Sequence, residues 1–181
     1  MNDDLTSLEG TLDAVWQRLL DGVERSEAPA RHVALASART NGGGAVRLVV
    51  LRAAERKTGT LNFYTHRASS KVGELRTNPR CEVLVWDAEA HFQIRLRMTA
   101  RVSDGPSDLW KSFGQGTRRN YAASPLPGTH LETADAFDPD ADAAQFMVIA
   151  CKIDEIETLH LGRSLQRRAL FKPSSSIWIA P

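Results

Sequence analysis

The stretch "AHFQIRLRMTARV", residues 90–102, alternates apolar and polar side chains along its whole length. The apolar positions share one parity: Phe92, Ile94, Leu96, Met98, Ala100 and Val102. Successive side chains of a strand point to opposite faces of a sheet, so this period of two predicts one long strand with an apolar face and a strongly polar face. The rest of the fold has to supply a core for the apolar face.

Other short segments, rich in Val, Ala and Leu, predict further strands on both sides of this one. They are residues 31–38, 45–54, 60–66, 80–87, 144–161, 163–172 and, as an edge strand, 174–181. The sequence "RTNGGG" between the first two segments predicts an antiparallel pair joined by a loose glycine turn. Since no βαβ rhythm is present, we predict a mainly β fold: a barrel of six or seven antiparallel strands with added helices.

Three helices are expected beside the strands. Residues 7–26 place apolar side chains at helical spacing, with Ser7 as the expected N-cap. Residues 69–78 predict a short helix that either Ser69 or Ser70 caps and that ends before a proline. The sequence "SDGPSDLWKSFGQ" predicts a third helix that begins near its proline, Pro106.

The region after this third helix, residues 117–144, is expected to be irregular. Its later part, from about residue 128 to residue 144, is rich in acidic side chains and predicts a solvated surface loop. With 181 residues in total, the chain is expected to form one domain, residues 1–181.

Composition excludes several classes of protein. The chain carries 23 Lys and Arg against 22 Asp and Glu, which disfavours nucleic-acid binding through Arg95, Arg97 and Arg101, because such binding needs a large basic excess. No signal peptide and no apolar run of roughly 20 residues is visible, so we expect no membrane span and a cytoplasmic location. Cys81 and Cys151 lie in apolar stretches and are expected to be buried free thiols. The histidines lack ligand spacing, so no metal site is expected.

The sequence "THRASSK", residues 65–71, concentrates hydroxyls and cations where a strand passes into a helix. One interpretation is solvation; the other is an anion site, because lysine, hydroxyls and the free amides of a helix N-terminus bind phosphate. From spacing alone, the solvated, capped helix is favoured. Arg47 and Arg52 bracket the nearby "LVVL" with opposite strand parity, so they point to opposite faces unless a bulge intervenes.

Several motifs occur in a fixed order within roughly residues 31–103. They are "RLVVLR" (47–52), "FYT" (63–65), a Ser-x-Lys helix start (69–71), "NPR" (78–80) and "Q-x-R" (93–95). This order resembles the pyridoxamine 5'-phosphate oxidase family, whose members are FMN-binding split β-barrels. The resemblance implies a homodimer with FMN at its interface and a small-molecule substrate. With it, the anion interpretation of residues 65–71 becomes the favoured one.

The same resemblance implies a set of FMN contacts. By matching position they are Arg47, Leu48, Val49, Val50, Leu51, Arg52, Tyr64, Thr65, Ser70, Lys71, Gln93 and Arg168. In this set Ser70 and Lys71 grip the phosphate, and Gln93 reaches the flavin from the other subunit. Additional candidates for the flavin edge or the substrate are His160, Arg118 and Arg119. For the two arginines, exposed positions in a loop are the slightly favoured interpretation. No catalytic residue is assigned.

The chain departs from the family pattern where the substrate is gripped. True oxidases carry an Arg-x-His pair there, and the aligned positions hold Ser164 and Gln166, which offer no fixed charge. The phosphate corner has one cation fewer than usual, Arg52 stands for a lysine, and His160 stands for a tryptophan. We therefore expect an FMN-dependent oxidoreductase that acts on a different small substrate. The alternatives are a nicotinamide-dependent flavin reductase and a flavin carrier or redox sensor without turnover.

Overall fold

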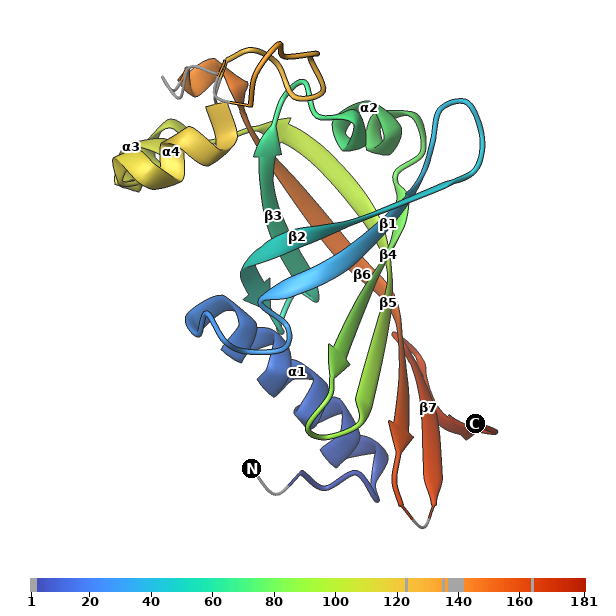
Figure 1. Ribbon diagram of the computed structural model, residues 1–181. Helices are drawn as coiled ribbons and strands as arrows, with labels where there is room; N and C mark the ends of the chain where they lie inside the picture. Colours follow the sequence, from blue (N-terminus) through green and yellow to red (C-terminus); the bar gives the residue numbers. More distant parts are fainter. Residues whose placement is uncertain (1–2, 123, 135, 137–141, 164) are drawn as a thin grey trace.

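The computed structural model describes residues 3–122, 124–134, 136, 142–163 and 165–181, and in them eight strands form one antiparallel sheet. The strands are β1 (His32–Ala38), β2 (Gly44–Glu55), β3 (Thr60–His66), β4 (Arg80–Asp87), β5 (Phe92–Asp104), β6 (Phe146–Leu161), β7 (Gln166–Lys172) and β8 (Ser175–Ile179). Their order is β3-β2-β1-β4-β5-β6-β7-β8, and β3 also pairs with β6. That pairing closes six strands into a barrel, which β7 and β8 extend (Figure 1). The predicted antiparallel barrel is confirmed.

Strand β5 is the long two-faced strand that its alternation predicts. Its apolar parity is buried from Phe92 to Ala100, while the intervening side chains face outward. It pairs with β4 and β6, and its register with β6 shifts between Arg97 and Met98, which makes Asp154 the extra residue of a bulge. The fully buried side chains around it form the barrel interior: Leu35, Leu51, Leu61, Phe63, Ile94, Leu96, Met98, Ile149 and Cys151.

Strands β1 and β2 form the predicted hairpin. Gly42 and Gly43 have φ angles of 91° and 83°, a left-handed conformation that favours glycine. Further along β2, pairing with β3 passes from Leu51↔Phe63 to Ala53↔Asn62, so Arg52 is the extra residue of a β-bulge. Before the bulge Arg47 has the parity of the buried Leu51, whereas Arg52 has the opposite one.

Helix α1 (Leu8–Glu24) covers one end of the barrel and packs against β2 (Figure 1). The predicted N-cap is confirmed, because the Ser7 hydroxyl accepts a hydrogen bond from the amide of Gly10 at 3.0 Å. Its apolar stripe, including Val15, Trp16 and Leu19, joins the main core. The N-terminal helix expected from residues 7–26 is therefore present with nearly the same limits.

The structure confirms two other predicted helices and corrects the region that follows them. Helices α2 (Ser70–Thr77) and α3 (Ser107–Ser112) match the predictions. The chain after α3 was expected to be irregular, but it forms helix α4 (Gln115–Ala122), and Ala143–Gln145 form a 3-10 turn, η1. Helix α4 forms because Tyr121 docks on a small aromatic core, a tertiary contact that local sequence does not reveal.

Cys81 and Cys151 are both buried free thiols, as expected. None of the described helices is long and apolar enough to span a membrane. Of the acidic segment around 128–144, residues 135 and 137–141 lie outside the described residues.

Candidate functional site

A cleft of about 310 Å³ opens where β2 and β3 meet the N-terminus of α2 and the end of α4. Figure 1 shows α2 and the α3–α4 pair on either side of the end of β3. The residues that line the cleft are His32, Leu48, Val49, Val50, Tyr64, Thr65, His66, Ser69, Lys71, Asn120, Tyr121 and Pro127. Six of them belong to the predicted FMN contacts: Leu48, Val49, Val50, Tyr64, Thr65 and Lys71.

Lys71 is the cation of this cleft. Its half-buried Nζ donates hydrogen bonds to Thr65 Oγ1 at 3.1 Å and to Ser69 Oγ at 2.5 Å. Both partners are neutral hydroxyls, and no carboxylate among the described residues forms a salt bridge with Lys71. Burial, followed by the nearby positive charge of Arg47, lowers the pKa of Lys71, and the charge of Glu74 only partly opposes this shift. The site therefore holds a partly desolvated positive charge that no carboxylate among the described residues pairs with directly.

The N-terminus of α2 adds backbone donors to the same corner. Ser69 is the N-cap, yet its side chain makes no capping hydrogen bond to the helix and instead accepts from Lys71. The first amides of α2 therefore lack the usual side-chain acceptor, and the helix dipole favours negative charge at this end. An ammonium group, two hydroxyls and helix N-terminal amides together fit a phosphate group.

Arg47 and Ser70 lie beside this corner but line a different pocket, of about 550 Å³. Arg47 donates from Nη2 to Glu74 Oε2 at 2.7 Å and from Nη1 to the hydroxyl of Ser37. Burial tends to raise the pKa of Glu74, but hydrogen bonds from Ser37 and Arg47 lower it overall. Arg47 is therefore paired with Glu74 and lines this second pocket, not the cleft of Lys71.

Helix α4 brings to the cleft residues that the sequence did not indicate. Asn120 and Tyr121 of the helix line it, as does Pro127 from the chain that follows. The buried Tyr121 hydroxyl accepts hydrogen bonds from Nε (2.9 Å) and Nη2 of Arg52. Arg52 itself stands at the bulge of β2, with its guanidinium near the rings of Tyr64 and Tyr121. These contacts were missed because the chain around Tyr121 was expected to be irregular.

Two predicted contacts, Gln93 on β5 and Arg168 on β7, lie outside the cleft of their own chain, as does the flavin-edge candidate His160 on β6. Gln93, Leu159 and Arg168 are in register across the three strands, which places Gln93 and Arg168 on the same outer face. Arg168 donates to Glu157 Oε1 at 2.9 Å. His160 has the opposite parity and contacts the buried ring of Phe92, so the sheet separates it from Gln93 and Arg168. Burial, then nearby positive charges, lowers the pKa of His160.

The remaining candidates occupy structural or exposed positions. Leu51 is fully buried in the core. Arg118 donates to the backbone carbonyls of Trp110 and Lys111, whereas Arg119 is exposed. Gln166 is the exposed first residue of β7, and Ser164 lies outside the described residues. The described residues therefore show no second cation turned into the cleft from these positions.

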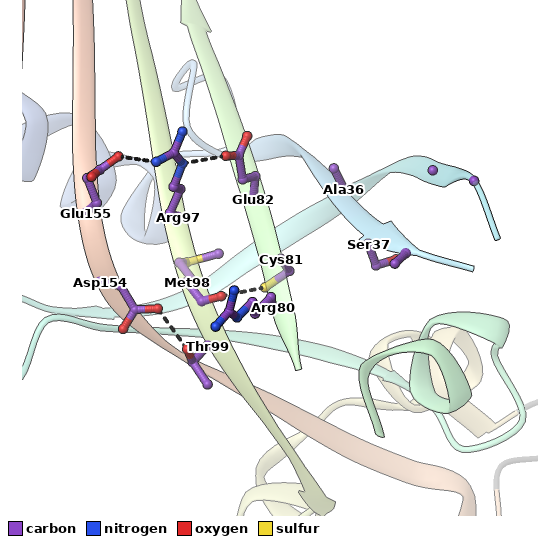
Figure 2. Close-up of a pocket in the computed structure, with 13 residues that line it drawn as sticks. Ala36, Ser37, Arg80, Cys81, Glu82, Arg97, Met98, Thr99, Asp154 and Glu155 are labelled. Carbon is purple, nitrogen blue, oxygen red and sulfur yellow. Dashed lines mark hydrogen bonds and ion pairs between the residues drawn. The ribbon is translucent and has the colours of Figure 1, made fainter. Parts of the chain in front are cut away.

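A larger cavity, of about 710 Å³, lies between the β1–β2 hairpin and β4, β5 and β6. Figure 2 shows Arg97 held between Glu82 and Glu155, at 3.0 Å and 2.8 Å. Both cations of this cavity, Arg80 and Arg97, are exposed. It contains none of the predicted FMN contacts, and Arg97 is already paired with two carboxylates, so we assign the phosphate corner to the smaller cleft.

Comparison with protein families identifies the family of the chain. A family model described as "Pyridoxamine 5'-phosphate oxidase, FMN-binding domain" matches residues 13–104, which is 92 of the 181 residues. The chain belongs to this family. The matched residues run from α1 to the end of β5 and include β2, β3 and α2, which build the phosphate corner. The family places the chain among flavin-binding proteins related to oxidoreductases. No curated protein matches the chain.

Solved structures share the fold of this member of the pyridoxamine 5'-phosphate oxidase family. A pyridoxamine 5'-phosphate oxidase-related, FMN-binding protein from Nostoc punctiforme has a TM-score of 0.76 and 23% identity, covering 98% of this chain and 100% of its own. PhzG from Burkholderia lata, solved with tetrahydrophenazine-1-carboxylic acid, has a TM-score of 0.74 and 19% identity, covering 99% and 95%. General stress protein 26 from Bacillus anthracis has a TM-score of 0.54 and 12% identity, covering 91% and 98%. At these identities the likeness is one of fold.

Proposed function

We propose that the protein binds FMN and is an oxidoreductase that acts on a small substrate other than pyridoxamine 5'-phosphate. The observation that carries this proposal is Lys71, a half-buried ammonium group that has only hydroxyl partners and stands beside a helix N-terminus in an open cleft. A cation in this state is stabilised by binding an anion. Family membership makes the phosphate of a flavin nucleotide the natural occupant.

The residues of the cleft divide between the two parts of such a ligand. Lys71, Thr65, Ser69 and the amides of α2 hold the phosphate. The apolar run Leu48–Val50 on β2 contacts the chain and ring beyond it. When bound, FMN supplies two-electron redox chemistry, and the protein supplies orientation and electrostatics. No acid or base of this chain is assigned to the reaction.

A second copy of the chain completes the proposed site. The apolar strip Val46, Leu48, Leu84 and Trp86 is 40–71% exposed and lies on the outer face of β2 and β4, on either side of β1. Leu48 belongs both to this strip and to the cleft. In a homodimer that covers the strip, the second copy therefore also forms one side of the cleft. Gln93, which lies opposite Trp86 in the β4–β5 ladder, is then at the interface rather than in its own cleft.

The choice of substrate follows from what surrounds the cleft. A pyridoxamine phosphate substrate brings a second phosphate, and a second phosphate needs fixed positive charge to hold it. Arg118 is bound to backbone carbonyls, and Gln166 is neutral and exposed on β7. At these two positions the chain offers no free positive charge, which supports a substrate without that phosphate.

The purified protein tests this function directly. We expect it to be yellow and to release FMN on denaturation, identified by mass. Stopped-flow mixing should bleach the flavin with a nicotinamide donor or another small reductant and leave it unchanged with pyridoxamine 5'-phosphate. A colourless protein that ignores added FMN contradicts the cofactor, and rapid bleaching by pyridoxamine 5'-phosphate contradicts the substrate. Bound FMN without turnover with any donor supports a flavin carrier instead.

A further inference from the structure

We propose that the hydroxyl of Tyr121 is the positioning group for Arg52, and that it thereby orients a second positive charge beside the FMN cleft. The proposal rests on the proposed function for the identity of the ligand. Tyr121 belongs to α4, outside the residues that match the family, so neither the family match nor the predicted contacts assign it a role.

Arg52 and Tyr121 are joined by two hydrogen bonds. Nε and Nη2 of Arg52 both donate to the single hydroxyl oxygen of Tyr121, which therefore uses both of its acceptor lone pairs on one guanidinium. No carboxylate among the described residues pairs with Arg52. Like Lys71, Arg52 thus keeps an uncompensated charge, and its partner is again a neutral hydroxyl.

Tyr121 itself is held firmly. It is 7% exposed and forms the small aromatic core with Phe146 and Val148. Its ring lies 5.9 Å from the ring of Tyr64 and 5.9 Å from that of Phe146. A buried ring with two χ angles places its hydroxyl at low entropic cost, so the guanidinium is oriented before any ligand arrives.

Arg52 does not itself line the cleft, but its guanidinium lies near the rings of Tyr64 and Tyr121, which do. Arg52 stands at the β2 bulge opposite residues 62–63 of β3, whereas Lys71 is bound to Thr65. At a rise of about 3.3 Å per residue, these points along β3 are roughly 7–10 Å apart. Nε and Nη2 are taken by Tyr121, which leaves the Nη1 edge of the guanidinium for a ligand. Arg52 therefore meets the part of FMN that lies away from the phosphate, and Tyr121 determines the direction from which it does so.

A double-mutant cycle separates positioning from packing. Y121F keeps the ring and its contacts and removes only the hydroxyl, and we expect it to weaken FMN binding about five- to tenfold. R52M should weaken FMN binding at least tenfold. In the R52M background, Y121F should change the dissociation constant less than twofold, because the hydroxyl then has no guanidinium to orient. S112A, which removes a hydroxyl bonded within α3, is the matched control and should bind FMN like the wild type.

A second readout needs no flavin and guards against misfolded variants. In the flavin-free protein, the Nε–H of Arg52 should give a slowly exchanging NMR signal that is lost in R52K, which assigns it, and broadened by exchange in Y121F. Equal losses of FMN affinity from Y121F in both backgrounds overturn the proposal, as does an Arg52 signal that Y121F leaves unchanged. If the wild-type protein shows the protected signal but binds no FMN, the proposed function and the role of Arg52 in ligand binding are both wrong. Only the hydrogen bonds between Arg52 and Tyr121 then remain.

Discussion

Arg18 and Lys71 are both cations withdrawn from solvent, and they are compensated in opposite ways. Arg18 on α1 donates to Asp87 at 2.8 Å and to Asp3 at 2.7 Å, and its guanidinium also lies 5.0 Å from the ring of Phe92. Burial alone opposes its charge, yet the hydrogen bonds and charges of the two carboxylates raise its pKa. Lys71 has hydroxyls where Arg18 has carboxylates, and its pKa is lowered.

This difference separates a structural charge from a binding charge. The groups around Arg18 leave no capacity for a ligand, so its ion pairs tie the N-terminus and α1 to the end of β4. The groups around Lys71 leave the ammonium short of one negative charge, which an anion can supply. Each cation therefore predicts its own mutant phenotype: loss of stability at Arg18 and loss of ligand affinity at Lys71.

The largest expected effect is on stability. R18M leaves the carboxylates of Asp3 and Asp87 withdrawn from water without their cation, and we expect the free energy of unfolding in denaturant to fall by about 3–5 kcal/mol. R56M removes the partner of Asp13, another α1 residue, from an ion pair whose side chains are 50% and 56% exposed. That control should cost less than about 1 kcal/mol. Similar losses for the two variants would contradict the structural role of Arg18.

The next effect concerns FMN affinity. K71M removes the charge that faces the phosphate, and we expect FMN binding, measured by fluorescence quenching, to weaken by about 2–3 kcal/mol, or roughly 30- to 150-fold. The free energy of unfolding of the flavin-free protein should stay level or rise, because an uncompensated charge has been removed. K152M controls for net charge, since Lys152 bonds to the carbonyl of Thr58 away from the cleft. If K71M is destabilised but binds FMN like the wild type, Lys71 is a structural charge and not a binding charge.

Stability should also depend on pH through Lys71. Its pKa in the folded protein lies below the ordinary 10.5, so the burial cost is fully present at neutral pH, where the amine is charged in both states. As pH rises between the folded-state pKa and 10.5, the folded protein loses the proton first, and the cost disappears. The unfolding free energy of the wild type should therefore rise relative to K71M over this interval. A difference that stays flat or falls would contradict the lowered pKa.

The smallest effect sharpens the role of the hydroxyls. T65V removes one of the two acceptors that orient Lys71 but leaves Ser69, so FMN binding should weaken by about 0.5–1.5 kcal/mol. T99V, which removes a hydroxyl bonded to Asp154 on the far ladder of β5 and β6, should leave FMN affinity unchanged. An equal response of the two variants in titrations would show that Thr65 has no special place in the site.

Much of the fold could be predicted because its causes are local. The alternation in residues 90–102 depends only on which face of β5 is buried, and the limits of β3 and β4 were predicted to the residue. Helix α4 could not be predicted, since its stability comes from aromatic contacts with β3 and β6 rather than from its own sequence. Closure of the barrel by β3 and β6 likewise depends on residues far apart in the chain.

The candidate site divides in the same way. Lys71 and Thr65 were identified because they flank one strand-to-helix junction, and the structure places their side chains 3.1 Å apart. The pairing of Arg47 with Glu74 joins two different elements and has no signal in the sequence. Ser69 rather than Ser70 faces the cleft, a difference that depends on the first turn of α2. In the sequence, only the Ser-x-Lys spacing of residues 69–71 indicated a role for Ser69.

The measurement that tests the central claim most directly is a crystal structure of the protein with FMN. We expect phosphate oxygens at roughly 2.7–3.2 Å from Lys71 Nζ and from the first amides of α2, with Thr65 and Ser69 at the same group. A phosphate bound instead at Arg47 and Ser70, or a Lys71 that keeps only its two hydroxyl partners while FMN lies elsewhere, would contradict it.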